Sequence, residues 1–260
     1  MLDILGFSEL VEERPAKEIF SIIERALHCT HDWTKKFPYW PLKTIYFSDT
    51  FLVYYEGEEF NAQFSALVDV ARKTLTALLS DGVPVRGAIT FGQFEMRDSQ
   101  QGETVFFGKA LIDAAKAEKT ENWIGVLATP SCWRCLQKEF GYDLELDEQE
   151  HRWLRRADGA LLLNPLGLPS DAYAKLKNDL KRPVNEWKLR EYPTAIWAFK
   201  FLVEQARRYS EAGDFSSREA AKYQATLAFL KKLLPQEQYE WLEQVAPRVP
   251  SLSVVRVSLC

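Results

Sequence analysis

The chain has 260 residues, 47% of them hydrophobic, which is enough to bury a substantial core in one large domain or two small ones. Lysine and arginine total 33 against 37 aspartates and glutamates, so the formal charge of -4 offers no basic excess to neutralise a nucleic-acid backbone. No apolar run approaches the roughly 20 residues of a membrane span, and the N-terminus lacks a signal peptide's basic region and apolar core. We expect a cytoplasmic protein that binds neither nucleic acid nor membrane.

The first part of the chain is predicted to alternate strands with helices. MLDI is typical of a short buried strand, and residues 16–35 carry apolar side chains at helical spacing. The β-rich runs KTIYFSD and FLVYYEG then meet almost directly, which predicts a hairpin with Asp49 at its exposed tip. Residues 61–80 are expected to form a second amphipathic helix, which ends at Asp81-Gly82.

Further strands are predicted after this helix. VPVRGAITFGQFEM is interpreted as one long strand, and GETVFFG and IGVLAT as two others. A helix is expected from about Lys109 to Lys119, and Pro130 opens a short one. Interleaved helices and hairpins of this kind indicate an α+β fold of the ferredoxin-like type, with helices packed on an antiparallel-rich sheet.

A composition shift near Pro165 predicts a domain boundary. Residues 1–165 would form the first domain and residues 166–260 a helical C-terminal extension. Helical patterns in the extension cover 170–181, 193–212, 216–234 and 236–245. Their apolar stripes are typical of core or partner-packing faces.

The cysteine pair in C-W-R-C, Cys132 and Cys135, could indicate a redox or zinc site. No second pair follows at zinc-site spacing, so we interpret the two residues as ordinary thiols on a short helix.

One arrangement in the sequence carries chemistry. Asp3 ends the first strand, the turn residues Gly6, Phe7 and Ser8 follow it, and Asp49 lies at the hairpin tip. Two carboxylates on neighbouring strand ends can converge on Mg2+ or Mn2+, and the turn would offer backbone N–H groups to phosphates. Ordinary turn residues would give the same pattern, so the pattern alone leaves both interpretations open.

Four segments together resemble the catalytic domain of class III nucleotidyl cyclases. They are LDILGFS at 2–8, IYFSDTFLVYY at 45–55, VPVRGAITFG at 83–92 and VFFGKALIDAAKAEK at 105–119, and the resemblance covers about residues 1–130. It implies that Asp3 and Asp49 bind two divalent metals, Mg2+ or Mn2+, per site. It also implies a homodimer whose active sites are shared between subunits.

The departures from the family concern the groups that act on the substrate. The family's Asn falls on Ile112 and its Arg on Lys116, so Lys116 is expected to stabilise the transition state from the second subunit. One position of the adenine-reading pair is Val105, which disfavours a purine. Tyr46 and Thr104 are expected to read a smaller base instead, although strict alternation would put Ile45 on the face of Asp49.

The narrower resemblance is to bacterial pyrimidine cyclases of the Pycsar anti-phage systems. It implies conversion of UTP to 3',5'-cyclic UMP and pyrophosphate, a second messenger that activates an effector protein. Cytidylate cyclase activity, a purine cyclase and a catalytically inactive nucleotide-binding module remain as alternatives. Arg86 is interpreted as a structural ion-pair partner, and the triphosphate-binding cation is left open, with Arg155 or Arg156 as candidates.

Overall fold

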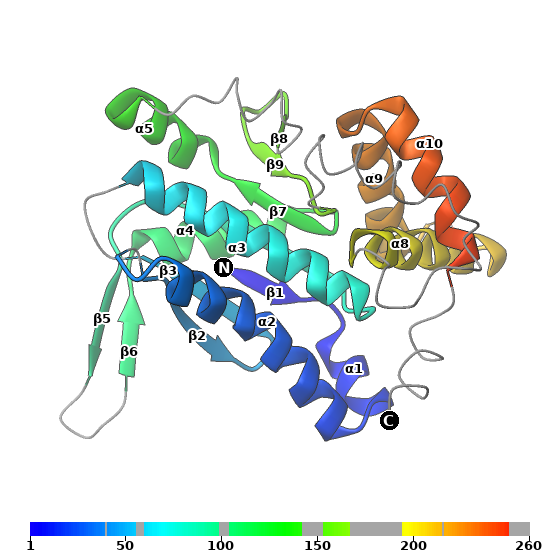
Figure 1. Ribbon diagram of the computed structural model, residues 1–260, viewed down its shortest axis with the longest axis horizontal. Coiled ribbons are helices and arrows are strands. Elements are labelled where there is room, and N and C mark those ends of the chain that lie inside the picture. Colours follow the sequence, from blue (N-terminus) through cyan, green and yellow to red (C-terminus); the bar gives the residue numbers. More distant parts are fainter. Residues whose placement is uncertain are drawn as a thin grey trace.

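The described part of the chain forms one large mixed sheet, a separate two-stranded ribbon and surrounding helices. The computed structural model describes residues 1–39, 41–55, 60–98, 104–141, 153–166, 194–214 and 216–249. The seven-stranded sheet has the order β2-β3-β1-β4-β7-β9-β8, and the ribbon consists of β5 and β6 (Figure 1). The predicted α+β class is confirmed at this level.

Most strand pairs of the large sheet are antiparallel, and only β4 and β7 are parallel. The strands of this sheet are β1 (Leu2–Ile4), β2 (Lys43–Phe47), β3 (Thr50–Tyr54), β4 (Val85–Ile89), β7 (Gly125–Ala128), β8 (Trp153–Arg155) and β9 (Leu161–Leu163). The ribbon strands are β5 (Glu95–Asp98) and β6 (Thr104–Phe107).

The helices begin and end at the signals that their sequences carry. They are α1 (Phe7–Glu13), α2 (Ala16–Lys36), α3 (Phe60–Ser80), α4 (Lys109–Thr120), α5 (Pro130–Phe140), α8 (Thr194–Glu211), α9 (Arg218–Leu233) and α10 (Gln236–Val245), followed by the short 3-10 turn η3 (Ala246–Arg248). In α5, Thr129 caps the first turn and Gly141 ends the helix in the left-handed region. No helix within the described residues is long and apolar enough to cross a membrane.

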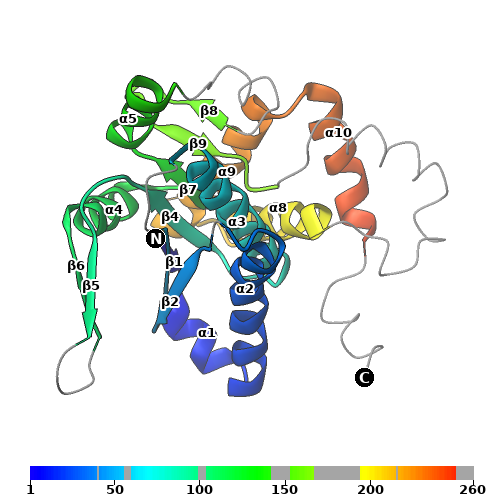
Figure 2. The ribbon, with the colours of Figure 1, turned by 60° about the vertical axis from the view of Figure 1, so that its left-hand side comes forward.

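The two faces of the central strands are covered by different helices. α2 and α3 lie on one side and α4 on the other (Figure 2). Paired residues in adjacent strands share a face, so Leu2, Phe51 and Tyr46 point to the α3 side. Asp3 and Arg86 point to the α4 side. The register of β1 therefore places the Asp3 carboxylate on the face of the sheet that α4 covers.

Most of the predicted elements of the first part are present, with one correction and two additions. The stretch VPVRGAITFGQFEM is not one strand, because β4 ends at Ile89 and β5 begins at Glu95 in a different sheet. Gly92, between them, has a φ of 152°, a backbone conformation that favours glycine. The helix at Phe7–Glu13 and the β8–β9 hairpin were not predicted. The helical pattern at 170–181 lies outside the described residues.

The C-terminal helices share a core with the sheet. α8 packs along α3, and Ile196, Phe199 and Leu202 are fully buried in the cluster that also contains Leu2 and Phe51. α9 is tied to β7 by the hydroxyl of Thr226, which accepts a hydrogen bond from the backbone N–H of Ile124 at 2.8 Å. The division into domains at 1–165 and 166–260 stays a prediction.

Candidate functional site

The structure brings Asp3 and Asp49 to one place. Asp3 lies in the central strand β1, and Asp49 lies in the turn between β2 and β3, where Ser48 has a φ of 57°. The backbone N–H of Ile4 donates to the carbonyl oxygen of Asp49 at 2.8 Å, which holds the hairpin tip against β1. Burial, and next the charge of Asp49, raise the pKa of Asp3 above its usual value. The two carboxylates therefore act on each other electrostatically.

Arg86 and Glu118 complete a charged cluster around Asp3. Arg86 lies directly opposite Asp3 on β4, and its Nη2 donates to Oδ2 of Asp3 at 3.5 Å. The same guanidinium contacts the carboxylate of Glu118, which α4 holds with only 3% of its side chain exposed. Burial, and then the charge of Asp3, raise the pKa of Glu118. The interpretation of Arg86 as an ion-pair partner is confirmed, and one of its partners is a candidate metal ligand.

The extension contributes a further cation. Lys222 of α9 is only 8% exposed, and Thr226, one turn later, bonds to Ile124. Ile124 adjoins the residue of β7 that pairs with Arg86, so the first turns of α9 lie beside the charged cluster. Burial lowers the pKa of Lys222, the charge of Glu219 opposes this, and the charges of Arg86, which lowers the pKa, and Asp3, which raises it, have smaller effects. No sequence pattern marks Lys222 as a site residue, because its position depends on how α9 docks.

Gly6, Phe7 and Ser8 follow β1 at the end that carries Asp3. Gly6 has a φ of 68° and caps α1, so the chain turns sharply from strand to helix. The backbone N–H groups at the start of a helix have no partner inside that helix. Ser8 is exposed, whereas the ring of Phe7 packs against the core. The turn can therefore offer backbone N–H groups near Asp3, with Phe7 as a structural anchor.

Tyr46 and Thr104 lie in different sheets. β2 and β3 pair without a bulge, so the Tyr46 ring lies on the side of the sheet opposite Asp3, 4.7 Å from the ring of Phe51. Its hydroxyl is buried without a hydrogen-bond partner among the described residues, and burial and then the charge of Asp49 raise its pKa. Thr104 is exposed on β6 in the ribbon. A role of either residue in reading the base stays a prediction.

Lys116 points away from the Asp3 of its own chain. Glu118 faces the cluster and is buried, whereas Lys116, two residues earlier on α4, is exposed. Ile112, one turn before Lys116, is 54% exposed on the same side of the helix. The single chain therefore does not bring Lys116 into the site of Asp3.

The donor set around Asp3 and Asp49 fits a hard divalent cation. Carboxylate oxygens are the ligands that Mg2+ prefers, and water or phosphate oxygens usually complete its coordination. Within the described ranges, no group of three or more histidine, cysteine, aspartate or glutamate side chains has an arrangement suited to hold a metal. Three acidic groups, Asp3, Asp49 and Glu118, face the two cations Arg86 and Lys222. When all five side chains are ionised, the acids outnumber the cations by one, so a bound cation would balance the charge of the cluster.

Cys132 and Cys135 lie on the same helix, α5. Burial raises the pKa of Cys132 to about 12. A buried thiol with a raised pKa is a poor nucleophile and a poor metal ligand. The position of both residues on a short helix is confirmed, and their interpretation as ordinary thiols stays a prediction.

Comparison with known proteins finds little. No protein family model matches the chain, and no curated protein matches its sequence. Among solved structures, a bacterial light-regulated adenylyl cyclase is similar with a TM-score of 0.38 and 16% sequence identity, covering 63% of this chain and 87% of that chain. This similarity is too weak to decide the fold or the activity, so the functional assignment rests on the residues of this chain.

Proposed function

We propose that this chain is a nucleotidyl cyclase of the class III type, which forms a 3',5'-cyclic nucleotide and pyrophosphate from a nucleoside triphosphate. The observation that carries the proposal is the convergence of Asp3 and Asp49 beside a turn with available backbone N–H groups. The succession β1-α2-β2-β3-α3-β4 with strand order β2-β3-β1-β4 supports a ferredoxin-like core.

Each group at the site has a place in this reaction. The 3'-oxygen attacks the α-phosphorus, the bond to the β-phosphate oxygen breaks, and the proton of the 3'-hydroxyl passes to solvent. Asp3 and Asp49 would hold two divalent cations, Mg2+ or Mn2+, which supply activation of that hydroxyl and neutralisation of the triphosphate. The backbone N–H groups of Gly6 to Ser8 and the ammonium of Lys222 bind the phosphates.

The proposal requires a homodimer with composite sites. Lys116 is exposed and turned away from its own Asp3, so it can act only in the site of a second copy. Exposed apolar side chains offer a contact surface on β2, β6 and α4. They are Phe47, Phe106, Phe107 and Ile112. A two-fold arrangement would give two equal sites, in which Lys116 neutralises charge as the bond to pyrophosphate breaks.

A pyrimidine triphosphate, UTP before CTP, is the proposed substrate. Val105 is an exposed apolar residue on β6 and provides no hydrogen-bonding group for a purine. Tyr46 is the candidate reader of the smaller base on the resemblance in the sequence, and this role requires its ring, which packs on Phe51 on the side of the sheet opposite Asp3, to turn towards the substrate. The cyclic nucleotide would then activate an effector protein in anti-phage defence, as the resemblance in the sequence implies.

A second candidate is an inactive cyclase-like module that binds a nucleotide without converting it. It is favoured by the apolar Ile112 at the position of the family's Asn, and by the engagement of Asp3 with Arg86. The two candidates make different predictions for product formation but the same prediction for nucleotide binding.

The test is to incubate the purified protein with each of the four ribonucleoside triphosphates and Mn2+, and to identify the products by mass. Cyclic UMP or cyclic CMP is the expected product, and an Asp3→Asn preparation made in parallel shows whether a contaminating enzyme formed it. Binding of UTP without any cyclic product would support the inactive module. A cyclic purine as the main product would overturn the pyrimidine assignment.

A further inference from the structure

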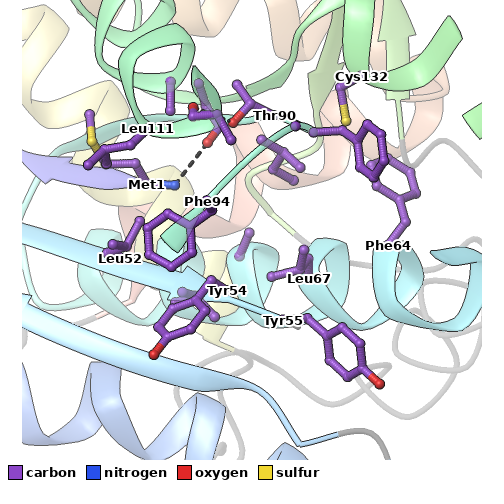
Figure 3. A pocket seen from close by; sticks show the side chains of 18 of the residues that line it. Met1, Leu52, Tyr54, Tyr55, Phe64, Leu67, Thr90, Phe94, Leu111 and Cys132 are labelled. Atoms are coloured by element: carbon purple, nitrogen blue, oxygen red, sulfur yellow. Dashed lines mark hydrogen bonds between the residues drawn. The ribbon is translucent and has the colours of Figure 1, made fainter. Parts of the chain in front are cut away.

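An apolar cavity in the core does not suit the phosphates of the proposed substrate. The cavity has a volume of about 550 Å³ (Figure 3), and Phe64, Leu67 and Leu111 contribute apolar walls from α3 and α4. Among the described residues that line it, the charged side chain is the acidic Glu95. A polyphosphate would lose its hydration in this cavity and gain no cationic side chain in return. The phosphates therefore need a surface that carries positive charge.

One side of α9 carries two cations in succession. Thr226 and Phe229 face the segment before β7, where the ring of Phe229 packs on that of Trp123 with 4.9 Å between the centroids. Because a helix has about 3.6 residues per turn, Lys222 and Arg218 lie on this same side of α9. Lys222 is one turn before Thr226, about 6 Å along the helix axis, and Arg218 is one turn before Lys222. We call Arg218 and Lys222 the α9 cation pair.

The α9 cation pair lies beside the charged cluster at Asp3. The residue after Ile124 pairs with Arg86 across β7 and β4, and Arg86 in turn pairs with Asp3 across β4 and β1. The hydrogen bond between Thr226 and Ile124 therefore docks α9 two strands from Asp3. The charges of Arg86, Arg218 and Asp3 all act on the pKa of Lys222, which agrees with this placement.

The two cations have no acidic partners of their own. Lys222 is buried and Arg218 is exposed, and neither side chain forms an ion pair or a hydrogen bond within the described residues. The carboxylate of Glu219 raises the pKa of Lys222 but forms no ion pair with it in this part of the chain. A buried ammonium without a partner is costly, so an anion bound at this place would stabilise Lys222.

Arg218 is also placed where a cation is unfavourable in the free chain. It is the first residue of α9 after the capping residue Ser217, whose hydroxyl accepts a hydrogen bond from the N–H of Ala220 at 3.1 Å. The N-terminal end of a helix carries a partial positive charge, and Lys222 adds a like charge one turn away. Both effects disfavour a cation at Arg218, and a bound anion would offset both.

We infer that Arg218 and Lys222 together bind the polyphosphate of the nucleotide, so that the C-terminal extension supplies a two-cation site. This inference rests on the proposed function and adds Arg218 to it. The guanidinium can donate two N–H groups to one phosphate, whereas the ammonium binds as a compact charge. Because one helical turn separates the two residues, the site takes a chain of phosphates in preference to a single phosphate. The carboxylates of Asp3 and Asp49 would hold the metal ions that the same polyphosphate binds.

The test uses inorganic tripolyphosphate with Mg2+, which requires neither a base nor catalysis. Calorimetric titration should show that the unmodified protein binds tripolyphosphate at least about tenfold more tightly than orthophosphate. Arg218→Gln is expected to raise the dissociation constant for tripolyphosphate on the order of tenfold and that for orthophosphate much less. Arg218→Lys keeps the charge and should lose less affinity. Lys231→Gln is the matched control, because Lys231 is exposed on the opposite side of α9 and should not affect either anion.

Thermal unfolding separates a binding role of Arg218 from a structural one. Without a ligand, Arg218→Gln should unfold at the same temperature as the unmodified protein or slightly higher, because an unfavourable charge is removed. Tripolyphosphate should raise the melting temperature of the unmodified protein more than that of Arg218→Gln. A clear loss of stability in the ligand-free variant would show that Arg218 serves the fold, and would overturn the inference.

The outcomes distinguish this inference from the proposed function. Normal binding of tripolyphosphate by Arg218→Gln, while the unmodified protein forms a cyclic nucleotide, would overturn only the inference. Weakened binding by Arg218→Gln, while the unmodified protein forms no cyclic nucleotide, would support the inference and count against the cyclase activity. Failure of the unmodified protein to bind tripolyphosphate, or an equal loss for orthophosphate in Arg218→Gln, would also overturn the two-cation site.

Discussion

The guanidinium of Arg86 lies 3.5 Å from the carboxylate of Asp3, straight across the pairing of β1 with β4. Because Arg86 also contacts Glu118, one buried cation serves two acids that would otherwise repel each other. Asp3 thus shares the positive charge of Arg86 with Glu118. The proposed cations must therefore compete with the guanidinium of Arg86 for the carboxylate of Asp3.

Removing Arg86 should destabilise the fold, because it leaves Glu118 buried without a partner. Arg86→Met is expected to lower the free energy of unfolding by about 3 kcal/mol, and Glu118→Leu in the same chain should restore most of it. Urea unfolding of the two single variants and the double variant measures the coupling. Additive effects of the two substitutions would show that Arg86 and Glu118 do not form a stabilising pair.

Asp49 should be essential for cyclisation and unimportant for stability. Its side chain lies at a hairpin tip and is only partly buried, so Asp49→Asn is expected to change the free energy of unfolding by less than about 0.5 kcal/mol. Product formation should nevertheless fall below detection, since a metal ligand is lost. Asp69→Asn on α3 is the matched control, because it removes another partly buried acid, one that pairs with Arg72 of its own helix. Unchanged turnover by Asp49→Asn would refute the assignment of metal ligands.

The composite site predicts complementation between inactive variants. Asp3→Ala and Lys116→Ala should each be inactive as homodimers, because every site lacks one group. In a randomly mixed sample about half of the dimers are mixed, and one of their two sites is intact, so about a quarter of all sites should recover. Turnover after co-refolding equal amounts measures this.

The control is the exposed Lys138→Ala on α5, which takes the place of Lys116→Ala in a second mixture with Asp3→Ala. Lys138→Ala should be active by itself, because Lys138 has no role in the proposed site. If a sample proven to contain mixed dimers of Asp3→Ala and Lys116→Ala stays inactive, the two residues do not belong to one shared site.

Lys222 should affect the binding of the triphosphate more than that of a nucleotide with fewer phosphates. Lys222→Gln is expected to raise the dissociation constant for UTP on the order of tenfold in the presence of Ca2+, and that for UMP much less. Calorimetric titration provides both constants. Lys231→Gln, an exposed lysine later on α9, is the matched control and should bind both nucleotides normally. Equal losses for UTP and UMP would argue against a phosphate contact.

The sequence predicted the parts of the site that depend on local pattern. The hairpin that carries Asp49 follows from two β-rich runs with almost no residues between them, and the strand that carries Asp3 follows from a short apolar run. Alternation along β2 also indicated that Tyr46 would not share a face with Asp49, and the bulge-free register puts its ring on the side of the sheet opposite Asp3.

Residues whose position depends on tertiary packing could not be predicted. Glu118 occupies an ordinary helical position, and only the packing of α4 over Arg86 makes it part of the cluster. Lys222 belongs to a helix whose docking no local pattern describes. The break between β4 and β5 is not predicted by any local pattern, because the apolar pattern continues through it and an isolated glycine such as Gly92 also occurs within strands.

The hydrogen bond between Thr226 and Ile124 holds α9, and with it Lys222, beside the strand that pairs with β4. If Lys222 binds the triphosphate, every nucleotide that binds also holds α9 in place, and by reciprocity any force or partner that pulls α9 away weakens nucleotide binding by the same factor. A partner that binds the extension and moves α9 would then regulate nucleotide binding at Asp3 and Asp49.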